Sequence, residues 1–182
     1  MSATPTNGTP NPQLTLTVLG CGTMGVAILS GILSSPTIAS LFTPSSHLHH
    51  PSISGTSTPL FPPAPSEGPL PPPNLPTRFL ACVKRPQSGT RLRASLPHPA
   101  VEIFVNENVK AVQEAQVVLL GCKPQVCEEI LTQEGMREAL EGKLLVSILA
   151  GVKSERLVEL CPPSTRVVRA MPNTASKVFR IP

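Results

Sequence analysis

The 182-residue sequence contains no Trp, no Tyr and no Asp, and aromatic residues make up only 3% of it. Proteins that bind single-stranded nucleic acids stack the bases on aromatic side chains, so this scarcity argues against that class. No Lys or Arg precedes Arg78, and Glu67 is the sole acidic residue before it. The formal net charge of +4 is too small and too scattered to indicate a nucleic-acid surface. We therefore expect no nucleic-acid partner.

The cysteines are odd in number and form no C-x-x-C pair. This pattern argues against a disulfide framework and against a zinc site, so we predict no bound metal. Several of them stand in apolar runs, where a free thiol packs as a small hydrophobic side chain. Such usage fits a reducing compartment, and we predict a cytoplasmic protein. The five are Cys21, Cys82, Cys122, Cys127 and Cys161.

The sequence also lacks the features of a targeting or membrane-spanning segment. Residues 1–13 are polar without a basic residue, unlike a signal or transit peptide, and we predict a disordered leader. Leu14–Leu33 is uncharged for twenty residues, which is long enough to cross a membrane. A strand, a turn and a helix explain its four glycines, whereas a membrane span does not. We expect no membrane partner.

Apolar strands alternate with helical patterns along most of the chain. The predicted strands are Leu14–Leu19, Arg78–Val83, Val101–Val105, Val117–Leu120, Leu144–Leu149 and Arg166–Ala170. The predicted helices are Gly25–Ser34, Ser88–Ser95, Asn108–Glu114, a segment from Val126 to Leu140, and a segment from a Ser154 cap to Leu160. This alternation predicts an α/β fold, a doubly wound parallel sheet of the Rossmann type, over residues 14–178.

Residues 37–77 interrupt this pattern. The segment is rich in Pro, Ser, Thr and His, a composition that cannot bury a core and favours extended chain. We predict a disordered insertion. Its histidines, His47, His49 and His50, have no further ligands around them, so a solvated loop is favoured over a metal site.

The first predicted strand runs into LGCGTMG, a G-x-G-x-x-G that opens an apolar helix. This is the fingerprint of a dinucleotide-binding fold. Gly20 would permit the tight turn, Gly22 would let the backbone approach a pyrophosphate, and Gly25 would let the helix pack on the strand. The helix start would then offer N–H groups and a positive dipole end to the phosphates. A glycine-rich turn without a ligand is the alternative.

The end of the second predicted strand distinguishes the two nicotinamide cofactors. An acid there binds the ribose 2′-hydroxyl of NAD, whereas cations accommodate the 2′-phosphate of NADP. This sequence offers Lys84, Arg85, Gln87 and Ser88, with no acidic residue nearby. The pattern favours NADP(H), with an ordinary basic turn as the alternative.

The ends of the later predicted strands carry residues for which the sequence allows two roles each. Lys123 follows a buried strand and precedes Pro124, which fixes the turn, and we assign both residues to the cofactor site. Lys123 would contact a cofactor phosphate or ribose, or else face solvent. Cys122 has no histidine placed to activate it, which favours packing or a backbone contact over a nucleophilic role. Asn173 and Thr174 would orient a small carboxylate substrate or cap the strand end. We find no paired carboxylates or catalytic triad and predict no catalytic side chain.

Taken together, the segments LGCGTMG, ACVKRP, GCKPQ, VSILAGV and VVRAMPNTAS resemble the N-terminal half of pyrroline-5-carboxylate reductases, especially fungal ones. The last three segments, in this order, are far more specific than the glycine motif. The resemblance covers about residues 14–178 apart from the insertion. It implies an oxidoreductase that reduces pyrroline-5-carboxylate to proline, the last step of proline biosynthesis, with NADPH or NADH.

The resemblance also implies roles for particular residues. Arg85 and Ser88 would lie near the 2′-phosphate, and Asn108 near the adenosine portion. The floor of the active site would be formed by Met171, Pro172, Asn173 and Thr174. The remaining implied contacts, from the phosphates to the nicotinamide, are Cys21, Thr23, Met24, Cys122, Lys123 and Ala150.

One departure from the family concerns the end of the chain. The family continues into a helical domain that makes the dimer and contributes substrate-binding residues, whereas residues 179–182 do not resemble it. We therefore expect a truncated form without the family dimer, and the sequence leaves open whether it is an active enzyme. The alternatives are a non-catalytic dinucleotide-binding fragment or interaction module, and a hydroxyacid dehydrogenase of the 6-phosphogluconate type.

Overall fold

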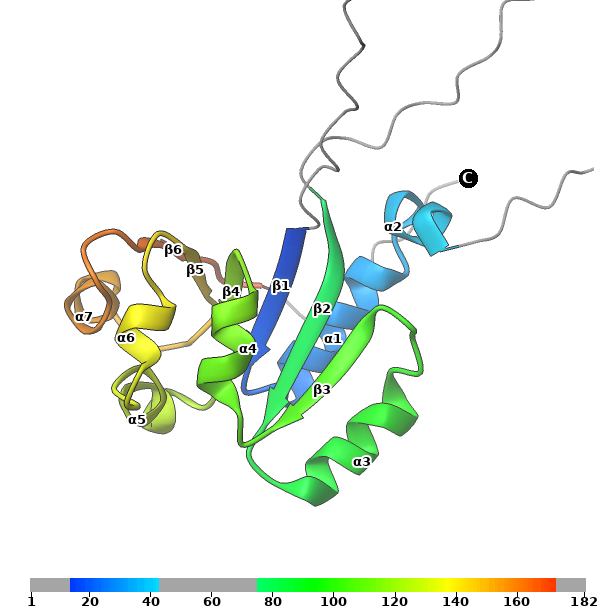
Figure 1. Cartoon of the computed structure of the whole chain (residues 1–182), viewed down its shortest axis with the longest axis horizontal. Helices are drawn as coiled ribbons and strands as arrows, with labels where there is room; N and C mark the ends of the chain where they lie inside the picture. The colour runs from blue at the N-terminus through cyan, green and yellow to red at the C-terminus, as the bar shows by residue number, and fades with distance from the viewer. Residues whose placement is uncertain (1–13, 43–74, 173–182) are drawn as a thin grey trace, which may run out of the picture.

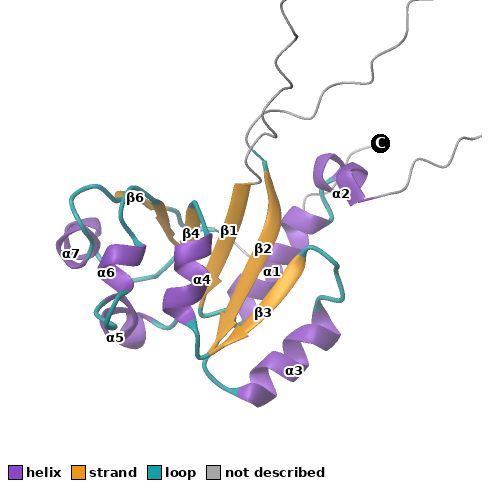
Figure 2. Cartoon of the chain, in the orientation of Figure 1, coloured by secondary structure: helices purple, strands orange, loops and turns teal. Residues whose placement is uncertain are grey.

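A computed structural model describes residues 14–42 and 75–172 of the chain. Its centre is a six-stranded sheet in the order β3-β2-β1-β4-β5-β6, in which all neighbouring strands are parallel (Figures 1 and 2). The strands are β1 Leu14–Leu19, β2 Pro76–Val83, β3 Val101–Val105, β4 Val117–Leu120, β5 Leu144–Ser147 and β6 Arg166–Arg169. The predicted doubly wound parallel sheet is therefore confirmed.

Helical segments connect the strands. They are α1 Thr23–Leu33, α2 Pro36–Phe42, α3 Pro86–Ser95, α4 Asn108–Glu114, a 3₁₀ turn at Pro124–Val126, α5 Cys127–Leu131, α6 Met136–Ala139 and α7 Ser154–Leu160. The first three pack on one face of the sheet, where Leu29, Ile38 and Leu92 are buried. The four helices α4 to α7 pack on the opposite face (Figure 1). Among the described residues, no helix is both long and apolar enough to cross a membrane.

The central strand β1 explains why this topology suits the sequence. Leu16 and Val18 contribute to the core beneath α1 and α3, whereas Leu19 contributes to the core beneath α4 to α7. A strand with helices over both faces needs apolar residues in succession, because no face meets water. The uninterrupted apolar run of β4 has the same origin.

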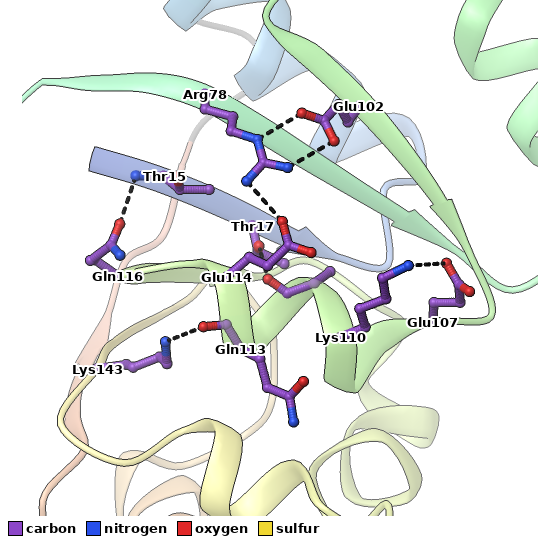
Figure 3. Close-up of polar contacts among 11 residues, drawn as sticks. Thr15, Thr17, Arg78, Glu102, Glu107, Lys110, Gln113, Glu114, Gln116 and Lys143 are labelled. Atoms are coloured by element: carbon purple, nitrogen blue, oxygen red, sulfur yellow. Dashed lines mark hydrogen bonds and ion pairs between the residues drawn. The ribbon is translucent and has the colours of Figure 1, made fainter. Parts of the chain in front are cut away.

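Polar contacts join elements at the end of the sheet where β1 begins (Figure 3). The guanidinium of Arg78 on β2 bonds both carboxylate oxygens of Glu102 on β3, at 2.7 and 2.8 Å, and also pairs with Glu114 of α4 at 2.8 Å. The buried Thr17 hydroxyl donates a 2.8 Å hydrogen bond to the carbonyl of Ala111. These contacts tie β1, β2, β3 and α4 together on the side of the sheet away from the glycine loop.

The structure differs from the sequence prediction at helix starts. The first helix begins at Thr23 instead of Gly25, because Gly22 takes the N-cap position. The last helix takes Lys153 as its N-cap, so Ser154 is its first residue and no side-chain cap forms. The predicted helical segment from Val126 to Leu140 is broken into short pieces, since Gly135 has a left-handed φ of 80°.

The largest correction concerns the start of the predicted insertion. Residues 37–42, expected to be extended chain, form most of α2. Pro36 suits a first helical position, and Ile38 is only 2% exposed against the core. The Phe42 ring packs edge-on against His98, with ring centroids 5.0 Å apart. The chain is described again from residue 75, where the strand β2 starts at Pro76 instead of Arg78.

Several predicted segments lie outside the described residues. They are the leader 1–13, the part of the insertion at 43–74 with its three histidines, and the tail 179–182.

Candidate functional site

A cleft of about 430 Å³ opens beyond the carboxyl ends of β1, β2 and β4. Ligands of open α/β sheets bind at this edge, where the strand order reverses beside the first strand. A volume of this size is in the range of small-molecule sites. Nine residues predicted for the cofactor site line the cleft, namely Gly20, Cys21, Gly22, Lys84, Arg85, Ser88, Asn108, Cys122 and Lys123.

Gly20 forms the turn at the end of β1. Its φ of +76° lies in the left-handed region that glycine adopts without strain. A Cβ built there would stand 2.5 Å from the Cα of Cys122, so no side chain fits between the two loops. The N–H of the next residue, Cys21, donates a 2.9 Å bond to the carbonyl of Cys82. The loop is thereby held against the ends of both β2 and β4.

The other two glycines of the motif have different surroundings. A Cβ at Gly25 would stand 3.1 Å from Cγ1 of Val18, so this glycine allows close packing of α1 on β1. A Cβ at Gly22 would meet no atom within 4 Å, because this residue faces the open cleft. Gly22 therefore leaves the backbone accessible to a ligand.

The N-terminus of α1 begins at this open position. All residues of this helix belong to the described part of the chain. Gly22 supplies no side-chain cap to it, and its first turn contains no acidic residue. The N–H groups of a first helical turn have no partner within the helix, and they carry the positive end of its dipole. This end can therefore bind an anion such as a phosphate.

The end of β2 contributes cations to the cleft. Lys84, Arg85 and Ser88 line it together, with Ser88 in the first turn of α3. No acidic residue is near Lys84 in the sequence, but Glu129 of α5 approaches it from across the cleft. Its Oε1 lies 2.9 Å from Nζ of Lys84. Forty-five residues separate the two in the chain, so only the fold brings them together.

The thiols of the site are poorly suited to nucleophilic chemistry. The neighbouring Cys127 thiol and burial together raise the pKa of Cys122. Cys122 in turn lowers the pKa of Cys127. Burial raises the pKa of Cys21 to about 11 and that of Cys82 to about 12. The thiols of Cys21, Cys82 and Cys122 therefore stay protonated at neutral pH, and a thiolate is the nucleophilic form.

Some predicted site residues do not line this cleft. Thr23, Met24 and Gly25 form the first turn of α1 beside it. Pro124 instead lines a second hollow, between the turn after β4 and the start of α7. Ala150 is exposed and lines neither.

The predicted substrate edge is described only in part. Met171 follows β6 and is 77% exposed, and Pro172 beside it is also exposed. Asn173 and Thr174 lie outside the described residues.

Sequence reasoning missed several residues that line the cleft. Asn106 follows β3 and has a φ of 58°, a conformation that asparagine tolerates better than most residues. Its position directly after a strand was a usable signal. Gln133 accepts a 3.2 Å hydrogen bond from the amide of Asn108, and no sequence pattern pointed to it. The others are Cys82, Val83, Gly121, Val126, Glu129 and Ile130.

The assembled geometry fits an elongated anionic ligand. An uncapped helix end, an open glycine and the three cations Lys84, Arg85 and Lys123 face one cleft. Among the described residues, Glu129 is the only carboxylate that lines it. The amides of Asn106, Asn108 and Gln133 add hydrogen-bonding groups farther along. A dinucleotide, with central phosphates and polar ends, has this distribution of groups.

The chain was compared with known protein families and sequences. The family described as "NADP oxidoreductase coenzyme F420-dependent" matches residues 72–151. A pyrroline-5-carboxylate reductase from Lophium arboricola is 44% identical over 91% of this chain and 50% of its own length. The enzyme from Neurospora crassa is 38% identical over 91% of this chain and 51% of its own. The enzyme from Schizosaccharomyces pombe is 36% identical over 88% of this chain and 48% of its own length.

These similarities confirm the resemblance seen in the sequence motifs. The chain spans about half the length of the curated relatives it matches.

Solved structures show the same fold at low sequence identity. A Plasmodium falciparum pyrroline carboxylate reductase with NADP bound matches with a TM-score of 0.50 and 15% identity, over 90% of this chain and 43% of that one. An imine reductase from Myxococcus stipitatus in complex with NAD+ matches with a TM-score of 0.50 and 16% identity, over 86% and 39%.

Proposed function

We propose that this chain, similar over 91% of its length to a pyrroline-5-carboxylate reductase, is the dinucleotide-binding part of an enzyme of that kind. Its cofactor is NADP(H), and NAD(H) is a second ligand of the same cleft. The observation that carries this proposal is the meeting of the Gly20–Gly25 loop with Lys84 and Arg85 at one cleft.

Each part of the cleft has a task in this proposal. The backbone at Gly22 and the start of α1 hold the pyrophosphate, and Arg85 with Ser88 receives the 2′-phosphate. Asn108 contacts the adenosine portion. Lys123 and Cys122 lie beyond the end of β4 and line the path toward the nicotinamide. These side chains orient the cofactor.

The chemistry of the proposed reaction asks little of side chains. When bound, the cofactor would supply a hydride to the C=N carbon of a cyclic imine, pyrroline-5-carboxylate, and the imine nitrogen would take a proton from water, which gives proline. The protein contributes position and polar support, which is why a site without a nucleophile or a paired carboxylate suits this reaction. Met171, Pro172, Asn173 and Thr174 are the proposed substrate edge.

The proposal also has a cellular side. All five cysteines are free in the structure, and free thiols are typical of reducing compartments. We place the protein in the cytoplasm on this ground.

The first test measures binding and turnover separately. Isothermal titration calorimetry of the full chain with NADPH and NADH reports binding, and loss of NADPH absorbance with pyrroline-5-carboxylate reports turnover. Binding with turnover supports the full proposal, and binding without turnover supports a non-catalytic dinucleotide-binding fragment. If neither nucleotide binds, the proposed site is wrong.

Exchange of Arg85 for aspartate tests the 2′-phosphate contact. We expect Arg85→Asp to weaken the binding of NADPH at least about tenfold and to affect the binding of NADH much less. The reason is that the change replaces a charge-assisted hydrogen bond to the 2′-phosphate by repulsion. Arg91→Asp is a matched control, because Arg91 is exposed on α3, the helix that begins directly after Arg85, and does not line the cleft. Equal losses for both nucleotides would contradict the assigned role of Arg85.

A further inference from the structure

The ion pair between Lys84 and Glu129 spans the cleft from one connection to another. Lys84 follows β2 directly, and Glu129 belongs to the short helix α5 after β4. Their charged atoms lie 2.9 Å apart, and both residues line the cleft. The pair therefore stands at the end of β2, where a nucleotide-binding sheet distinguishes a ribose hydroxyl from a phosphate.

This ion pair is easily exchanged for a ligand. The two side chains are 74% and 58% exposed, and exposed ion pairs contribute little to stability. The neighbouring acid Glu128 points to a different partner, since its carboxylate lies 2.6 Å from Arg156 and it lines the second hollow. Glu129 is thus the acid of α5 that acts on the cofactor cleft.

We propose that Glu129 is a specificity-determining residue that lowers the preference of this cleft for 2′-phosphorylated over unphosphorylated dinucleotides. This inference rests on the proposed cofactor site. A 2′-phosphate must compete with Glu129 for Lys84, and it enters the field of a like charge. A free 2′-hydroxyl instead donates a hydrogen bond to a carboxylate. The cleft thus contains one group for each cofactor: Lys84 for the 2′-phosphate of NADP(H) and Glu129 for the 2′-hydroxyl of NAD(H).

The test uses two nucleotides that correspond to the adenosine ends of NADP(H) and NAD(H) and lack the nicotinamide. Adenosine 2′,5′-bisphosphate and adenosine 5′-monophosphate are titrated calorimetrically into the full chain as wild type, Glu129→Gln and Glu128→Gln. Glutamine keeps the shape of the side chain and removes its charge. Circular dichroism checks that the variants are folded, which their surface positions favour.

We expect Glu129→Gln to bind the bisphosphate about five- to tenfold more tightly, with the monophosphate unchanged or weaker. The gain should shrink as salt is raised, because the charges are exposed. Glu128→Gln has the same charge change one residue away and should stay within about twofold of wild type. Lys84→Gln should weaken binding of the bisphosphate. In a protein that already carries Lys84→Gln, the change Glu129→Gln should raise the affinity for the bisphosphate by a smaller factor than it does in wild type.

The outcomes separate this inference from the proposed function. If wild type binds the bisphosphate and Glu129→Gln leaves the ratio of the two affinities unchanged, the role of Glu129 is wrong while the cofactor site stands. An equal gain in Glu128→Gln would mean that net charge, and not position, causes the effect, and would also overturn it. If no protein in the series binds either nucleotide, the cofactor site itself is wrong.

Discussion

Gly20 stands where the turn after β1 meets the turn after β4. Its left-handed φ and its contact with the backbone of Cys122 are separate reasons for glycine at this position. The contact matters for the cleft as well as for stability, because both turns line it. Any side chain at position 20 must push the two turns apart.

We expect Gly20→Ala to lower the free energy of unfolding by about 2 to 4 kcal/mol, from backbone strain and overpacking combined. Urea denaturation followed by circular dichroism measures it. Gly31→Ala is the matched control, since a Cβ at this exposed position of α1 meets nothing within 4 Å. That control should stabilise the protein by about 0.5 to 1 kcal/mol. Similar effects for the two variants would contradict the steric argument.

At this scale, sequence reasoning succeeded where the cause is local. The G-x-G-x-x-G spacing predicted a tight turn at Gly20 and close helix packing at Gly25, and the structure has both. Glu129 could not be predicted, because its approach to Lys84 depends on how the turn after β4 is placed. Charge partners from distant segments are a tertiary property.

The contact of Arg78 with two carboxylates joins three elements at the amino end of the sheet (Figure 3). Arg78 lowers the pKa of Glu102 through a hydrogen bond and through charge attraction, and the pKa of Arg78 is raised in turn. The folded protein therefore holds the Glu102 proton less tightly than the unfolded chain does. This contribution to stability is present above the unfolded pKa of about 4.3 and is lost as pH falls through the lower folded value.

We expect wild type to lose more stability than Glu102→Gln when pH falls through the acid range below about 4.3. The difference should be at most about 1 kcal/mol, because Glu102 is half exposed and solvent screens the pair. Urea denaturation at a series of pH values measures it. Glu138→Gln, at an exposed position of α6, is the control and should follow wild type. Parallel curves for wild type and Glu102→Gln would show that the pair contributes nothing.

The elements themselves were predictable where the apolar pattern is long or bounded by turns. The strands at Leu14–Leu19, Val101–Val105 and Val117–Leu120 were predicted to the residue. Helix α2 was missed because its stability comes from contacts of Ile38 with the core and of Phe42 with His98. The Pro and Ser content of a segment does not predict such tertiary contacts.

At the scale of the whole molecule, the cleft couples ligand binding to folding. It is built from the ends of β1, β2 and β4, so a ligand in it would contact the ends of three neighbouring strands at once. The unfolded chain cannot bring these ends together. A ligand of the cleft therefore stabilises the folded state by mass action.

We expect NADPH at a concentration one hundred times its Kd to stabilise the chain by about 2.7 kcal/mol. Differential scanning calorimetry should show a rise in Tm that grows with the logarithm of NADPH concentration. Nicotinamide mononucleotide lacks the adenosine end that Arg85 and Ser88 would hold, and at the same concentration it should raise Tm far less. An unchanged Tm in NADPH would contradict binding at the cleft.

The position of β1 in the middle of the sheet has a consequence for how the protein is made. The N–H of Thr15 bonds the Gln116 side chain, 101 residues along the chain, and β1 pairs with β4 there. At ribosomal rates of about 5 to 20 residues per second, β1 waits about 5 to 20 seconds for that neighbour. Parallel pairing over such separations is also slow to form. The edge of β1 that faces β4 thus has no partner during this interval, and unpaired strand edges favour aggregation.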